Sequence, residues 1–146
     1  MITFETSVRI KRQIDEVFSY VSDPLNFPRW NSAVEAVRKT SAGANGVAST
    51  YSMERELPTG RSVNQLEVVA SWRPHKFAIR TIAGPTPFLY RYRFSTEEGE
   101  TIVSLDAEVE LPGSAVLLPL IARRLVKNGV DANLATLKQI LETARR

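Results

Sequence analysis

Few polar side chains in this sequence fall where they could meet a buried ligand. Five lie on the apolar faces of predicted strands: Tyr51, Arg55, Thr81, Tyr90 and Tyr92. A tyrosine hydroxyl can orient a ligand carbonyl or hydroxyl, and an arginine can hold a carboxylate or a phosphate. The alternative is that the tyrosine row serves packing, with its hydroxyls at the rim, and that Arg55 reaches solvent. The first interpretation predicts a site with apolar walls and a few hydrogen-bond donors.

Residues for metal or nucleophile chemistry are scarce. The chain has no cysteine and a single histidine, His75. Metal sites normally need several converging His, Cys or carboxylate ligands, so we expect no metal and no cofactor. A Ser-His-Asp triad would have to use His75, which lies in a predicted hairpin connection where a solvated side chain is expected. Gly43 and Gly46 indicate a loop, but they lack the lysine and the following helix of a phosphate-binding loop.

Composition and charge narrow the classes of protein further. The 146 residues, 43% of them hydrophobic, fit a single domain over residues 1–146. The apolar run at residues 115–122 is too short to cross a bilayer, and the N-terminus alternates polar with apolar residues, unlike a signal peptide. A net charge of +3 is too weak to predict nucleic-acid binding. We therefore expect a cytoplasmic protein without integral membrane contact, whose oligomeric state the sequence leaves open.

Hydrophobic periodicity predicts the elements that position these side chains. Residues 2–10 alternate as in a strand with one wet face, and Ile14, Val17, Phe18 and Val21 then follow the spacing of a short amphipathic helix. Pro24 ends that helix and, with Pro28, leaves room for one further helical turn. About six strands follow, joined by short turns, which predicts an antiparallel meander.

The end of the chain predicts one long helix that Ser114 can cap. Its apolar stripe includes Ile121, Leu125, Val130, Leu134, Leu137 and Leu141. Pro119 and Gly129 predict a bend or a break. Arg123, Arg124 and Lys127 form a basic cluster, either a solvated helix face or a site for an acidic partner or membrane surface. A twisted sheet has a concave side, which only this helix is long enough to fill.

The segment VFSYVSDPLNFPRWN at residues 17–31, together with this order of elements, resembles a known superfamily. It is similar to the START and birch-pollen-allergen superfamily (SRPBCC), specifically its polyketide cyclase/dehydrase and lipid transport family. The matching positions are Val17, Phe18, Tyr20, Val21, Asp23, Pro24, Pro28 and Trp30. Many relatives place a proline before the first helix, where this chain has Lys11-Arg12-Gln13; the difference affects only a helix start.

The resemblance implies an α+β helix-grip fold: a seven-stranded antiparallel sheet wrapped around a long C-terminal helix, with two short helices after the first strand. It also implies an elongated apolar cavity between sheet and helix. Phe27 and Trp30 would lie at its mouth, or would instead plug the end of the core. We expect the cavity to be lined by Phe27, Trp30, Tyr51, Met53, Arg55, Leu66, Val68, Ile79, Thr81, Tyr90, Tyr92, Leu105, Ile121 and Leu125.

Three functions are compatible with such a cavity. The protein could bind or carry a small hydrophobic ligand such as a lipid, an isoprenoid or a polyketide. It could be a metal-free cyclase or dehydratase, with Arg55 as the charged group. It could be a protein-interaction module whose cavity is filled by side chains. We favour the first and assign no catalytic residue, because no acid and base pair can be assembled from the sequence.

Overall fold

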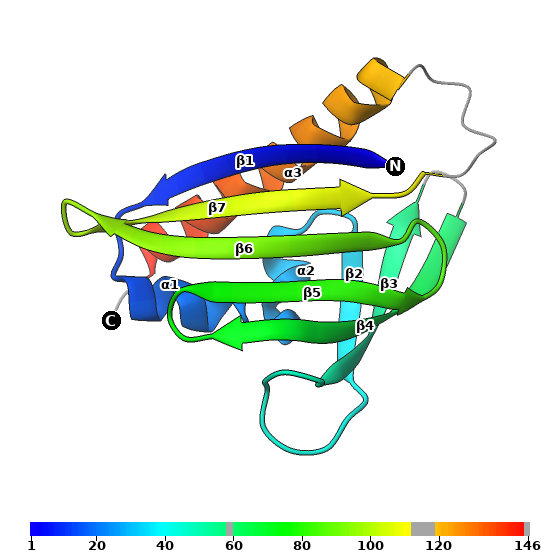
Figure 1. Cartoon of the computed structure of the whole chain (residues 1–146), viewed down its shortest axis with the longest axis horizontal. Helices are drawn as coiled ribbons and strands as arrows, with labels where there is room; N and C mark the ends of the chain where they lie inside the picture. The colour runs from blue at the N-terminus through cyan, green and yellow to red at the C-terminus, as the bar shows by residue number, and fades with distance from the viewer. Residues whose placement is uncertain (58–59, 112–118, 145–146) are drawn as a thin grey trace.

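Antiparallel strands form one curved sheet in the computed structural model, which describes residues 1–57, 60–111 and 119–144. The strands are β1 (Ile2–Ile10), β2 (Val34–Lys39), β3 (Thr50–Leu57), β4 (Gly60–Trp72), β5 (Lys76–Ala83), β6 (Phe88–Glu97) and β7 (Glu100–Val109). Their order across the seven-stranded sheet is β1-β7-β6-β5-β4-β3-β2 (Figure 1). The predicted antiparallel meander is confirmed, and β1 and β2 form its two edges.

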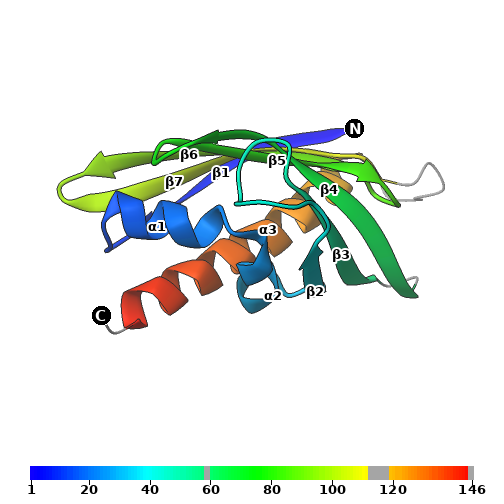
Figure 2. The same ribbon diagram turned by 90° about the horizontal axis from the view of Figure 1, so that it is seen from below.

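The helices lie on the concave side of this sheet. They are α1 (Ile14–Val21), the 3₁₀ turn η1 (Pro24–Asn26), α2 (Phe27–Trp30) and α3 (Pro119–Thr143). Figure 2 shows α3 crossing beneath the sheet, with α1 and α2 beside it. Asp23 caps η1 by accepting a hydrogen bond from the Leu25 N–H at 3.1 Å, which fixes the turn between the helices. The predicted helix-grip fold is confirmed.

The buried stripe of α3 differs in part from the prediction. Leu134, Leu137 and Leu141 are buried as expected, but Ile121 and Leu125 are 47% and 56% exposed. Counting back from Leu134 in steps of four reaches residues 130, 126 and 122, so the inner side of the first turns carries Ala122 and Val126 instead. The helix is continuous through Gly129, so a break there is wrong, and the proposed Ser114 cap lies outside the described residues.

Side chains of α3 bind the free edge of β1. Arg123 Nε donates to the Thr3 carbonyl at 2.9 Å, and Lys138 Nζ donates to the Arg9 carbonyl at 2.7 Å. Lys127 Nζ pairs with Asp131 at 2.9 Å, and Asp131 also accepts from the Thr6 hydroxyl. Part of the predicted basic cluster thus satisfies a sheet edge that would otherwise be open to pairing with another chain.

The ion pairs on the outer face of the β6–β7 hairpin run diagonally across the strand register. Arg91 lies opposite Asp106, and Arg93 lies opposite Ser104. The ion pairs are diagonal, however: Arg91 Nη1 meets Glu108 Oε2 at 2.6 Å, and Arg93 Nη2 meets Asp106 Oδ2 at 3.4 Å. Long side chains reach diagonal neighbours on a sheet as easily as direct ones. Arg91 is therefore paired with a diagonal neighbour and not with Asp106, which lies directly opposite it.

Two features are absent from the described residues. No helix within residues 1–57, 60–111 and 119–144 is long and apolar enough to cross a membrane. Across the same ranges, no three His, Cys, Asp or Glu side chains converge as metal ligands would.

Candidate functional site

A cavity of about 90 Å³ lies between the concave face of the sheet and the helices α2 and α3. Its wall consists of Phe27, Asn31, Ala33, Met53, Arg55, Phe88, Tyr90, Tyr92 and Asn133. Pockets for drug-sized ligands usually measure roughly 300–1,000 Å³. The cavity in this conformation therefore accommodates only a small molecule.

Five of the residues expected to line a cavity do so: Phe27, Met53, Arg55, Tyr90 and Tyr92. Another six are buried in the core and do not line this cavity: Trp30, Tyr51, Leu66, Val68, Ile79 and Leu105. Their inward orientation was predicted correctly, and Val68 instead borders a separate pocket with Asn45 and Arg73. The inner space is consequently shorter than the elongated cavity that the resemblance implied.

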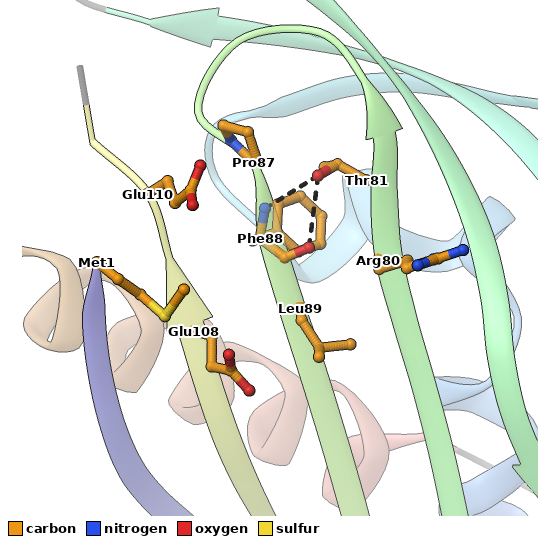
Figure 3. Close-up of a pocket in the computed structure, with 8 residues that line it drawn as sticks. All are labelled: Met1, Arg80, Thr81, Pro87, Phe88, Leu89, Glu108 and Glu110. Atoms are coloured by element: carbon orange, nitrogen blue, oxygen red, sulfur yellow. Dashed lines mark hydrogen bonds between the residues drawn. The ribbon is translucent and has the colours of Figure 1, made fainter. Parts of the chain in front are cut away.

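Three residues of the expected lining lie elsewhere. Ile121 and Leu125 are on the exposed side of α3, for the reason of helix phase given above. Thr81 hydrogen-bonds through its hydroxyl to the Phe88 N–H at 3.1 Å and lines a separate depression of about 200 Å³ (Figure 3). That depression lies beside Met1 and Glu108, away from the inner cavity.

Sequence reasoning missed four lining residues: Asn31, Ala33, Phe88 and Asn133. Phe88 begins the same alternating aromatic row as Tyr90 and Tyr92, and that signal could have identified it. Asn133 directly precedes Leu134 on the buried stripe of α3, which is a weaker signal. Asn31 and Ala33 follow α2 in a segment without periodicity, so no pattern could have placed them.

The guanidinium of Arg55 is fixed along one edge. Its Nε and Nη2 atoms donate to Asn64 Oδ1 at 3.1 and 2.7 Å, and Nη2 also donates to the Pro85 carbonyl at 3.0 Å. Asn64 is fully buried and donates in turn to the same Pro85 carbonyl at 2.7 Å. Arg55 is therefore held in place by β4 and by the β5–β6 turn, and its side chain is half-buried.

Gly84 allows the turn to approach Asn64 this closely. Its φ of +105° lies in the region that favours glycine, and an added Cβ would come within 2.5 Å of the Val63 carbonyl oxygen and 2.7 Å of Asn64 Nδ2. Any larger residue would have to displace the backbone that presents the Pro85 carbonyl. The support behind Arg55 therefore depends on a residue outside the cavity.

Burial governs the electrostatics of the cavity. It raises the pKa of Tyr90 to about 12, although the nearby Arg55 charge acts in the opposite direction. Burial also raises the pKa of Tyr92 well above its usual range, and it lowers the pKa of Arg55. A guanidinium stays charged in proteins. At neutral pH the cavity therefore contains one cation and two protonated phenols.

Aromatic rings form the wall around these groups. Phe27 contacts Trp30 edge to face with ring centroids 5.9 Å apart, and Trp30 contacts Tyr92 in the same way at 6.4 Å. Phe77 stacks on the far side of Tyr92 at 6.1 Å. Phe27 thus lines the cavity while Trp30, 3% exposed, packs behind it in the core. Of these two residues, only Phe27 therefore contributes to the cavity wall.

The fold and the enclosed site define a helix-grip protein, and comparisons with known proteins specify its family. The sequence pattern of the family described as "Polyketide cyclase / dehydrase and lipid transport" matches residues 1–142. The chain belongs to this family, as the resemblance had suggested. In sequence, it matches no curated protein significantly.

Solved structures share the fold at low sequence identity. A START superfamily protein from Mycobacterium smegmatis superposes with a TM-score of 0.81 at 15% identity, covering 96% of this chain and 97% of that protein. The di-domain ARO/CYC StfQ of the steffimycin biosynthetic pathway gives 0.77 at 15% identity, covering 97% of this chain and 51% of StfQ. The structure of Ara h 8.0201 gives 0.71 at 12% identity, covering 97% and 98%. At these identities the likeness shows the fold alone.

Proposed function

We propose that the protein binds a small, predominantly apolar ligand in the cavity between the sheet, α2 and α3. The observation that carries this proposal is the wall itself, where Phe27, Met53 and Phe88 surround a space that Arg55 and Tyr90 also reach. Apolar surface with a few polar groups is the usual composition of a small-molecule site. The family description, which includes lipid transport, supports the same class of function.

The size of the cavity limits the expected affinity. Apolar burial contributes about 25 cal/mol per Å², so a ligand that buries roughly 150–200 Å² gains about 4–5 kcal/mol before the costs of association. A molecule of that size binds in the millimolar to micromolar range when polar contacts add to this gain. Longer ligands would require Phe27 or the aromatic rings behind it to move.

The first experiment is native mass spectrometry of the protein purified from its own host, which we expect to show a co-purifying small apolar molecule. The second measures uptake of a hydrophobic dye. Tyr92→Leu removes a ring from the cavity wall and should weaken uptake, whereas Leu125→Gln on the exposed side of α3 should leave it unchanged. Retention of uptake by Tyr92→Leu, or no uptake by the unmodified protein, would contradict the proposal.

One observation favours a cyclase or dehydratase as a second candidate. Arg55 and the phenols of Tyr90 and Tyr92 line one cavity, and such donors could polarise a carbonyl. The cavity wall contains no histidine or carboxylate to serve as a base, which counts against catalysis. Conversion of a polyketone substrate that Arg55→Met abolishes, while circular dichroism shows the fold intact, would replace binding with this function.

A further inference from the structure

The hydrogen-bond donors that reach the cavity are not all used within the protein. Arg55 engages its neighbours through Nε and Nη2, and Nη1 makes no hydrogen bond to any described residue. The hydroxyls of Tyr90 and Tyr92, which line the same cavity, likewise make none within the described ranges. Three donors on residues that line the cavity from β3 and β6 therefore have no acceptor among the described residues.

The opposite wall does not supply that acceptor. Asn31 Nδ2 donates to the Phe27 carbonyl at 3.1 Å, and Asn31 Oδ1 accepts from Asn133 Nδ2 at 3.4 Å. Asn133 Oδ1 accepts from the Ser32 N–H at 3.1 Å. The two amides thus satisfy one another and the backbone, and the lining contains no carboxylate.

The charge of Arg55 has no counterpart in the part of the chain that the structure describes. Arg55 takes part in no ion pair there, in contrast to Arg80, Arg91 and Arg93 on the outer face of the same sheet. An incompletely solvated cation without an acidic partner is costly, and an anion that enters the cavity recovers part of this cost. The electrostatics of the cavity therefore favour a negatively charged ligand over a neutral one.

We infer that the ligand is a small carboxylic acid, whose carboxylate binds Arg55 and the Tyr90 hydroxyl while its apolar part packs against Phe27, Met53 and Phe88. The inference rests on the proposed binding function and names its ligand class. A carboxylate fits better than a phosphate because the site offers one cation and a single free guanidinium nitrogen. A phosphate carries up to two charges and three acceptor oxygens, which normally require more donors.

The support behind Arg55 makes the site preorganised for such an anion. Asn64 and the Pro85 carbonyl hold Nε and Nη2 before any ligand enters. The ligand therefore does not have to order a long, flexible side chain, which would otherwise cost affinity. Arg55→Lys would keep the charge but lose this fork of hydrogen bonds, because an ammonium cannot reproduce its planar geometry.

The experiment compares 3-methylbutanoate with 3-methylbutanamide, a pair of nearly equal shape that differs in charge. NMR titration of the full chain at neutral pH should show at least about tenfold tighter binding of the acid, as expected for a charge-assisted hydrogen bond. Arg55→Met should abolish the difference, and Tyr90→Phe should reduce it several-fold without removing a charge. Arg93→Met is the matched control on the outer face and should retain the full preference.

Two outcomes would overturn the inference, and they differ in what they say about the proposed function. Equal affinity of the unmodified protein for the acid and the amide would refute the carboxylate while leaving the small-ligand function intact. No binding of 3-methylbutanoate would also refute it, and dye uptake would then decide whether the proposed function survives. Should Arg55→Met fail to fold, an unchanged acid preference in Tyr90→Phe and Arg55→Lys together would count against the assignment.

Discussion

Asn64→Ala should destabilise the protein because it removes the partner that orients Arg55. Asn64 Oδ1 accepts from Nε and Nη2 of Arg55 at 3.1 and 2.7 Å, and Nδ2 donates to the Pro85 carbonyl at 2.7 Å. The substitution leaves the Arg55 Nε without its acceptor in a half-buried position. It also removes the bond that ties β4 to the β5–β6 turn.

The magnitude follows from these contacts. Hydrogen bonds to a charged group contribute about 1.5–3 kcal/mol, and a neutral one contributes about 1 kcal/mol. Arg55 Nη2 keeps its bond to the Pro85 carbonyl at 3.0 Å, so part of the interaction survives. We expect Asn64→Ala to lower the free energy of unfolding by about 2–4 kcal/mol.

A double-mutant cycle with Arg55→Met tests the reasoning. Urea unfolding can be followed by the fluorescence of Trp30, which is 3% exposed and should respond to the loss of the core. We expect a coupling energy of about 1–2 kcal/mol between the two sites. A coupling below about 0.5 kcal/mol would show that Asn64 and Arg55 stabilise the fold independently, and the preorganisation argued above would fail.

Four further predictions concern Gly84, Gly129, Tyr90 and Asp106. Gly84→Ala should cost at least about 2 kcal/mol in urea unfolding, because its Cβ would clash with the backbone. Gly129→Ala, where an added Cβ meets nothing within 4 Å inside α3, should instead stabilise by about 0.5–1 kcal/mol. The raised pKa of Tyr90 favours the folded state fully below about pH 10, the ordinary tyrosine value, and this contribution disappears as the pH rises through about 12. A tyrosinate absorbance titration should accordingly show a step near pH 12 that Tyr90→Phe removes. Asp106→Asn should lower the free energy of unfolding measured in urea by less than about 1 kcal/mol, since its ion pair with Arg93 is exposed.

Periodicity predicted the sheet well because it depends on local alternation. Tyr90 and Tyr92 alternate with Arg91 and Arg93, and the structure buries or half-buries the tyrosines and exposes the arginines. Predicting which residues share one face of a strand requires no knowledge of residues far away in the sequence. The same reasoning placed Met53 and Arg55 on the inner face of β3.

The cavity is formed by contacts between residues that lie far apart in the sequence, and no local sequence pattern predicts such contacts. The ring of Tyr92 forms part of the cavity wall, and Trp30 contacts that ring where α2 packs against β6. Asn64 appears as one polar residue in a strand, and only the structure shows that it supports Arg55. The prediction that Leu125 faces the core was wrong because apolar residues occupy both sides of the first turns of α3. The sequence was therefore compatible with two different buried faces there.

The order of strands in the sheet also determines when each strand can pair during synthesis of the chain. Ile2 pairs with Val109, so the first strand of this sheet along the chain is completed by the last one. Until β7 emerges, β1 has no partner in the sheet, and the growing β2–β6 meander ends in an unpaired strand at β6. Such long-range pairing slows folding and leaves strand edges open to other chains in the meantime. In a nascent chain arrested within β6 both β1 and β6 would therefore lack a partner strand, and the sheet would close only after β7 has emerged.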